Sequence, residues 1–216
     1  MPRRAASGHQ PDRDALYDIA AAQAGYFSSS QANDAGFSRQ LLQFYLRDGR
    51  IDRAGRGIFR LRHFPSTFDH EDLVPVWLWT DKVGVFSHQT ALALNQLSDA
   101  LPSKAHVTLP LAWRARRLRV PQGVVLHYAD LSPSERDWSG PVPVTTPLRT
   151  IEDAVRDRLE AHWVVQATQQ GVARGLFTRR DATRAAARGE ADAEAAAWAT
   201  PGVTQVVDRL QITPSL

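Results

Sequence analysis

The sequence predicts an α+β protein built from two folded parts. Residues 36–62 contain a helix start, a glycine stop and a basic stretch with a Gly-x-Gly tip, which is typical of a short helix followed by a β-hairpin. Further along, residues 105–111 alternate in strand fashion, whereas residues 147–157 have the spacing of an amphipathic helix. Residues 63–67 have the composition of a linker. The expected division is a disordered start over 1–11 and folded domains over 12–64 and 66–216.

Three short helices and a basic hairpin are predicted in the first part. The expected elements are helices over 12–24, 28–35 and 38–48 and strands over about 50–54 and 57–62. Ser28 and Gln31 have the spacing of a capping box. Gly55 and Gly57 permit a tight turn between the two strands. This order is that of a winged helix-turn-helix, which places its third helix in a major groove and its hairpin against the DNA backbone.

Positive charge is concentrated in the same segment. The whole chain has 26 Lys and Arg against 23 Asp and Glu, a net charge of +3. Residues 36–62 alone hold seven arginines against Asp48 and Asp52. Clustered charge attracts phosphates more strongly than the same charge dispersed over a surface. The alternative is a solvated polar face in a chain that uses Arg in place of Lys.

The third helix carries the residues expected to read DNA. Arg39, Gln43 and Arg47 recur every four residues and share one face. Arginine makes bidentate hydrogen bonds to guanine, and glutamine makes them to adenine. Arginines of a wing contact phosphate or the minor groove. The candidate DNA-binding residues are Ser38, Arg39, Gln40, Gln43, Phe44, Arg47, Arg53, Arg56 and Arg60. Two points stay open: Arg39 and Arg47 can be ordinary surface residues, and Phe44 can be a core residue or an exposed contact for thymine methyl groups.

The second part is expected to be a compact α+β domain with a small antiparallel sheet. The predicted helices run over 71–80, from Ser87 to about Leu97, over 147–157 and 161–173, and from Thr178 to about Arg188. The predicted extended segments are 105–111, a hairpin of 117–120 and 124–128, and 142–147. Residues 190–199 can be helical or frayed, and residues 203–212 have strand-like content.

Composition excludes several classes of function. The chain has no cysteine, so it forms neither a disulfide nor a thiolate metal site. The histidines show no zinc spacing, and the sequence has neither a glycine-rich phosphate loop nor a nucleophile elbow. We therefore expect no catalytic residue, no metal and no cofactor. The polar N-terminus and the lack of a run of about 18 apolar residues predict a soluble cytoplasmic protein without membrane contact.

Two clusters in the second part have more than one interpretation. The second basic cluster comprises Arg114, Arg116, Arg117 and Arg119. It can reach DNA beside the wing, bind an acidic partner, or be a charged edge strand that prevents aggregation. Arg149 and Asp153 stand four residues apart on a predicted helix. They indicate either an ordinary ion pair worth a few tenths of a kcal/mol, or a contact with a partner or with another element of the domain.

The order of parts resembles the AbiEi-like antitoxins of abortive-infection (type IV) toxin–antitoxin systems. The N-terminal motifs that carry the resemblance are Gln31-Ala32, Gly36-Phe37-Ser38, Gly49 and Arg56-Gly-Ile-Phe-Arg-Leu61. In the second part they are Phe86-Ser-His-Gln-Thr-Ala91 and Val144-Thr-Thr-Pro-Leu-Arg-Thr-Ile-Glu-Asp153. The resemblance covers about residues 12–185. Phe44 departs from it, since many relatives have a polar residue there.

The resemblance implies a DNA-binding antitoxin that represses its own promoter. The partners it implies are double-stranded promoter DNA, with inverted repeats, and a toxin of the nucleotidyltransferase type. The N-terminal domain would bind the DNA and the C-terminal domain would take part in neutralisation. Two other functions fit the same sequence: a protein that masks a toxin without sequence-specific DNA binding, and a repressor whose second domain senses a small molecule.

Overall fold

The computed structural model describes residues 10–66, 68–99 and 102–198, which form two compact units. Unit 1 comprises Met1–Phe86 and Pro102–Val144, and unit 2 comprises Ser87–Leu101 and Thr145–Leu216. The predicted α+β class is confirmed. Residues on both sides of position 65 belong to unit 1. The expected boundary between two folded domains near residue 65 stays a prediction. The expectations for residues 1–9 and 203–212 lie outside the described residues.

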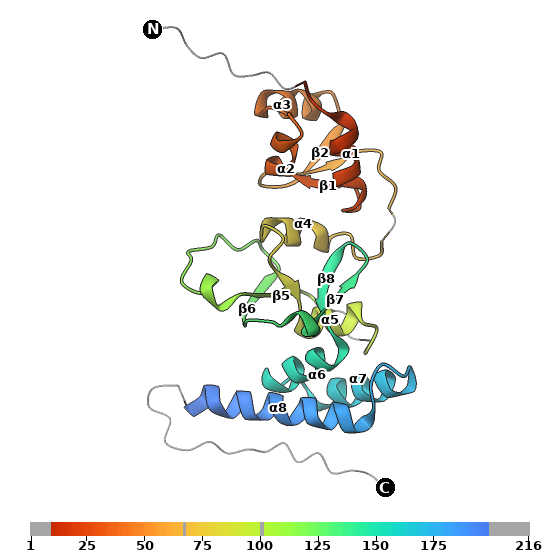
Figure 1. The fold of residues 1–216 in the computed structure, drawn as a ribbon, viewed down its shortest axis with the longest axis vertical. Coiled ribbons are helices and arrows are strands. Elements are labelled where there is room, and N and C mark those ends of the chain that lie inside the picture. Colours follow the sequence, from red (N-terminus) through yellow and green to blue (C-terminus); the bar gives the residue numbers. More distant parts are fainter. Residues whose placement is uncertain (1–9, 67, 100–101, 199–216) are drawn as a thin grey trace. The chain divides into compact units, whose positions relative to one another are not determined.

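The first part of unit 1 is a winged helix-turn-helix (Figure 1). Its elements are α1 (Arg13–Ala21), β1 (Tyr26–Ser28), α2 (Ser29–Asp34), α3 (Arg39–Arg47), β2 (Ile51–Gly55) and β3 (Ile58–Leu61). The predicted three helices and basic hairpin are confirmed, and β2 and β3 are called the wing from here on. The sequence did not predict β1, which pairs antiparallel with β3 and sets Phe27 opposite Phe59. The sheet order is therefore β1-β3-β2.

Side-chain caps fix where the three helices begin. Asp12 caps α1, and Ser28 and Gln31 form the predicted capping box at α2. At α3, the Ser38 hydroxyl accepts a hydrogen bond of 3.2 Å from the Leu41 backbone N–H. Each cap satisfies a backbone donor that the helix leaves unpaired, so these boundaries are encoded locally in the sequence.

One hydrophobic core joins these helices to the sheet. Leu16 of α1 and the inner residues of α3, Leu42 and Tyr45, are buried in it. Phe27 and Phe59 stack in its centre, with ring centroids 5.7 Å apart. The burial of Leu42 and Tyr45 leaves the opposite face of α3 to solvent.

The rest of unit 1 is a five-stranded sheet with α4. The elements are α4 (Leu73–Trp79), β4 (Val85–Phe86), β5 (Ala105–Leu109), β6 (Val124–Tyr128), β7 (Arg136–Ser139) and β8 (Val142–Thr145), with 3-10 turns η1 (Leu111–Trp113) and η2 (Pro133–Glu135). The strand order is β6-β5-β4-β8-β7. The sheet is mixed, because β4 runs antiparallel to β5 but parallel to β8.

The predicted hairpin of residues 117–120 and 124–128 is wrong. β6 pairs with β5 in parallel, and Ala105 lies opposite Val124. The predicted turn exists, since Gly123 has φ of +79°. Residues 110–123 nevertheless form a crossover, called the crossover loop below, because parallel neighbours cannot be joined by a tight turn. The charged edge strand expected there is therefore absent from the described sheet.

Unit 2 contains α5 (His88–Leu94), α6 (Pro147–Arg156), α7 (Ala161–Ala173) and α8 (Arg179–Trp198). α5 ends before the predicted Leu97, because Gln96 takes φ of +53° and the Leu97 N–H bonds back to the Leu92 carbonyl at 2.8 Å. α8 extends well past the predicted Arg188, so the segment that could be helical or frayed is helical to Trp198. Among the described residues, no helix combines the length and apolar character needed to cross a bilayer.

Candidate nucleic-acid interface

One side of α3 presents a continuous exposed face. The exposed side chains are Ser38, Arg39, Gln40, Gln43, Phe44 and Arg47. From Arg39 to Arg47 they occupy a sector of about 140° around the helix axis. Leu42 and Tyr45 are buried on the other side. All six residues predicted on this helix therefore point away from the core, and their contact with DNA stays a prediction.

Tyr45 makes ring contacts on the buried side of α3. Phe37 and Tyr45 pack edge to face with ring centroids 5.7 Å apart. The Arg50 guanidinium lies 5.1 Å from the centroid of the Tyr45 ring and pairs with Asp48 at 2.5 Å.

The open point about Phe44 is settled by its exposure: 48% of its surface is accessible, so it is not a core residue.

The wing carries two exposed arginines near its tip. Arg56 occupies the turn, and Gly57 beside it has φ of +72°, a conformation that favours glycine. Arg53 lies on the exposed side of β2, with its guanidinium 5.5 Å from the centroid of the Phe59 ring. A guanidinium over an aromatic face is held without losing its outward hydrogen-bond donors.

Arg60 lies apart from the other predicted wing contacts. Its side chain is 19% exposed and pairs with Glu71 at 3.3 Å. Its guanidinium also lies 5.4 Å from the centroid of the Tyr26 ring. These contacts attach the wing to the segment before α4, so we leave Arg60 out of the proposed interface.

Carboxylates within the chain neutralise only some of the arginines in residues 36–62. Arg62 pairs with Asp52 at 2.7 Å, and hydrogen bonding from Arg62 lowers the pKa of Asp52 below its ordinary value. Arg50 and Arg60 have the partners given above. Within residues 10–66, 68–99 and 102–198, no ion pair joins a carboxylate to the remaining four, called the unpaired arginines: Arg39, Arg47, Arg53 and Arg56. These four lie on the exposed face of α3 and on the wing.

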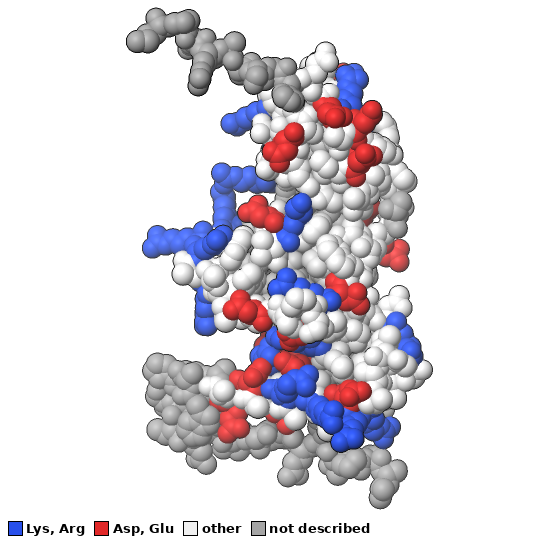
Figure 2. Space-filling model, in the orientation of Figure 1, with Lys and Arg blue, Asp and Glu red and all other residues white. Residues whose placement is uncertain are grey.

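The second basic cluster lies in the crossover loop. Arg114, Arg116, Arg117 and Arg119 are all exposed. The Arg116 guanidinium stacks over Trp113, 4.0 Å from the ring centroid. Figure 2 shows Lys and Arg side chains protruding from one edge of unit 1.

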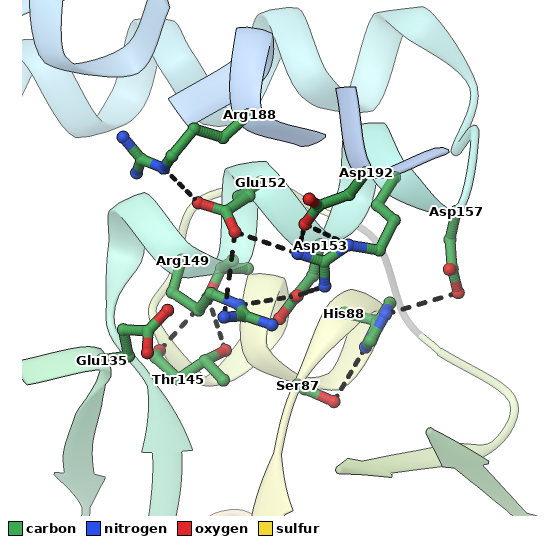
Figure 3. A network of polar contacts seen from close by, with 12 residues as sticks. Ser87, His88, Glu135, Thr145, Arg149, Glu152, Asp153, Asp157, Arg188 and Asp192 are labelled. Carbon is green, nitrogen blue, oxygen red and sulfur yellow. Dashed lines mark hydrogen bonds and ion pairs between the residues drawn. The ribbon is translucent and has the colours of Figure 1, made fainter. Parts of the chain in front are cut away.

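An ion network with buried members on α6 ties that helix to α8 in unit 2 (Figure 3). Arg149 and Asp153 form the i,i+4 ion pair that their spacing indicated, at 2.8 Å, but they are 8% and 1% exposed, so the pair is buried and the energy of a surface pair does not apply to it. Arg156 bridges Asp153 at 2.8 Å and Asp192 of α8 at 2.5 Å. Burial raises the pKa of Asp153, although the neighbouring cations oppose this. The network makes the contact with another element that the sequence left open.

The sequence analysis missed most of this network. Glu152 accepts from Arg156 at 2.9 Å and from Arg188 of α8 at 2.7 Å. The spacing of Glu152 and Arg156 on one helix was a usable signal. Nothing in the spacing of residues points to Arg188, because its contact joins positions far apart in the chain.

Ser87, His88 and Asp157 form a second polar chain in unit 2 (Figure 3). His88 contacts the Ser87 hydroxyl through Nδ1 at 2.8 Å and Asp157 through Nε2 at 3.4 Å. The three groups have the composition of a hydrolase triad, but Ser87 is 0% exposed and a substrate cannot reach its hydroxyl. The arrangement therefore supports a structural role.

Residues 12–61 thus have the fold of a winged helix-turn-helix, with the unpaired arginines on α3 and the wing. In agreement, residues 14–62 match the model of a protein family described as transcriptional regulator, AbiEi antitoxin. The resemblance stated from the sequence is confirmed for this segment.

The comparisons with individual proteins add one solved structure. The chain is similar to the crystal structure of RV2827C protein from Mycobacterium tuberculosis, with 13% sequence identity and a TM-score of 0.40. The alignment covers 80% of this chain and 79% of that one. No curated protein matches the sequence.

Proposed function

We propose that this protein is an antitoxin that represses its own promoter by binding DNA through α3 and the wing. The observation that carries the proposal is the set of four unpaired arginines on these two elements. An exposed guanidinium without a carboxylate partner offers all its donors to an incoming phosphate or base. The match of residues 14–62 to an antitoxin regulator family supports the same function.

The spacing of the exposed side chains suits a major groove. Arg39 and Arg47 stand eight residues apart, about 12 Å along a helix, which corresponds to three to four base pairs at about 3.4 Å each. Gln43 lies between them on the same side. In this proposal the arginines fork onto guanine, Gln43 binds adenine and Phe44 contacts thymine methyl groups. Ser38 and Gln40 border these contacts.

Arg53 and Arg56 supply the contacts of the wing. They would bind phosphates or enter the minor groove beside the site read by α3. Such contacts set the register of the protein on the duplex but do not select sequence. We place one copy of the chain on each half of an inverted repeat, since two-fold related half-sites suit two identical chains.

Fluorescence anisotropy with a duplex from the chain's own promoter tests the DNA-binding proposal. A scrambled duplex of the same length is the control, and both are titrated over a series of salt concentrations. We expect tight binding to the promoter and weak binding to the scrambled duplex. Equal, weak binding to both duplexes that disappears with salt would mean that the wing binds DNA only through non-specific electrostatic attraction. That result would favour the toxin-masking function.

The second half of the proposal is that the chain counteracts a nucleotidyltransferase-like toxin. The test expresses a toxin of this kind, encoded beside the chain's own gene, from an unrelated promoter. Intact chain is supplied either as wild type or with Arg39→Ala and Arg47→Ala. We expect both to restore growth, which would separate neutralisation from repression. If the wild type gives no rescue, the antitoxin function is wrong even where promoter binding holds.

A further inference from the structure

The crossover loop has a defined conformation although it contains no strand. At its start, the Leu111 N–H bonds to an Asp130 carboxylate oxygen at 3.0 Å. Successive turns follow, in which the Trp113 N–H bonds to the Pro110 carbonyl and the Arg116 N–H to the Trp113 carbonyl, both at 2.9 Å. At its end, β6 pairs with β5 directly after Gly123. The loop therefore presents its arginines from a fixed scaffold.

The arginines of this loop lack carboxylate partners in the part of the chain that the structure describes. Asp130 lies at the base of the loop, but its carboxylate is used to hold the Leu111 N–H. Arg116 stacks on Trp113, which orients the guanidinium and leaves its edges available. The other three, Arg114, Arg117 and Arg119, are exposed. In this they match the unpaired arginines of α3 and the wing.

A hollow in unit 1 joins the loop to the wing. It encloses about 1050 Å³, and Gly55 and Arg56 of the wing line one part of it while Arg119 and Val120 of the loop line another. Trp79 of α4 contributes an aromatic wall. Arg56 and Arg119 thus border the same space although they are far apart in the sequence. The cationic surface of the wing continues onto the crossover loop.

We propose that the crossover loop is a second DNA-backbone contact, which binds the phosphates of the duplex that flanks the site of the wing. This rests on the proposed promoter binding and extends its footprint. Continuity with the wing favours DNA over an acidic protein, since one duplex can occupy both surfaces. Arginine suits the task because its planar fork binds phosphate oxygens in pairs.

The test compares two triple variants of the full chain that remove equal charge. The loop variant carries Arg114→Gln, Arg117→Gln and Arg119→Gln. The control variant carries Arg179→Gln, Arg180→Gln and Arg184→Gln, which are exposed residues of α8 in unit 2. Each is titrated by anisotropy against a promoter duplex with long flanks and against one trimmed on the wing side to the region read by α3 and the wing.

We expect the loop variant to lose affinity only on the flanked duplex. Each phosphate contact changes the slope of log affinity against log salt by about 0.9, so each costs about 3.5-fold between about 50 mM and about 200 mM salt. Over that range the affinity of the wild type for the flanked duplex should fall about 40-fold more than that of the loop variant. The control variant should follow the wild type on both duplexes.

Two results would overturn DNA binding by the crossover loop. Both differ from the result expected if promoter binding itself fails. If the wild type selects its promoter and the loop variant equals it on both duplexes, the loop does not bind DNA although the regulator does. Unchanged DNA binding with lost growth rescue would assign the loop to an acidic protein surface. If the wild type shows no promoter selectivity, the proposed function itself fails.

Discussion

Two sets of arginines, one in each unit of this molecule, are used in opposite ways. In unit 2, Arg149 is buried against Asp153 within α6, and Arg156 joins Asp153 to Asp192 of α8. In unit 1, the unpaired arginines and those of the crossover loop are exposed and have no carboxylate partner within the described residues. The comparison teaches that residue type alone does not mark an interface. The two sets differ in whether the chain provides the opposite charge, and the second set is proposed as an interface because it also lies on α3, the wing and the crossover loop.

The largest effect is expected from removing an arginine that the chain itself neutralises. Arg149→Met leaves Asp153 buried with one ion-pair partner fewer, and breaking such a pair costs about 3–5 kcal/mol of unfolding free energy. Urea unfolding followed by circular dichroism measures this, with Arg179→Met on the exposed start of α8 as the control. Promoter affinity under native conditions should stay unchanged. A loss below about 1 kcal/mol would mean that the pair behaves like a surface pair.

The next effect concerns the arginines of α3. Arg39→Ala and Arg47→Ala should each cost about 1–3 kcal/mol of promoter binding and relax base preference at one position. Unfolding free energy should change little, because both side chains are exposed. The matched control is Arg50→Ala, whose partner is Asp48. Anisotropy with single-base variants of the promoter measures both the affinity and the base preference. Unchanged promoter binding by both Arg39→Ala and Arg47→Ala would show that α3 is not part of the interface.

Phe44 is an exposed apolar side chain on α3, and we expect it to contact thymine methyl groups. Replacing thymine by uracil in the promoter removes methyl groups, and a buried methyl is worth about 0.8 kcal/mol. The wild type should lose about this amount at each contacted thymine, whereas Phe44→Ala should bind both duplexes equally. A thymine preference that persists in Phe44→Ala would show that another residue makes the contact.

The smallest effect is electrostatic and local to the wing. Arg62→Gln removes the hydrogen bond that lowers the pKa of Asp52, so that pKa should rise toward its ordinary value. A lowered folded-state pKa stabilises the fold above the unfolded pKa, and this stability is lost as pH falls through the folded pKa. The variant should therefore lose less stability on acidification than the wild type. NMR titration of the Asp52 carboxyl measures the shift, and an unchanged pKa would show that Arg62 is not its cause.

Local signals predicted most of the helix-turn-helix. The caps at Ser28 and Ser38 and the spacing of Leu42 and Tyr45 lie within a few residues of one another, so the sequence specifies them directly. The exposed face of α3 follows as the complement of that buried spacing. Sequence reasoning therefore placed the candidate residues of this helix correctly toward solvent.

Contacts between distant residues were not predictable in the same way. β1 is three residues long and is defined by its pairing with β3. The parallel pairing of β5 and β6 depends on a crossover that carries no periodic pattern. Arg60 has the sequence position of a wing contact, but its pairing with Glu71 occupies it within the chain. In each case the deciding partner lies far away in the sequence, where spacing gives no information.

Two double variants that remove equal charge near the wing test whether unpaired arginines, rather than bulk charge, govern promoter binding. One carries Arg53→Gln and Arg56→Gln, and the other carries Arg50→Gln and Arg62→Gln. The slope of log promoter affinity against log salt is measured for both and for the wild type. We predict that the first variant reduces the slope by about 2, at about 0.9 for each phosphate contact, and that the second leaves it unchanged. An equal reduction in both would contradict the account, because bulk charge rather than unpaired arginines would then govern binding.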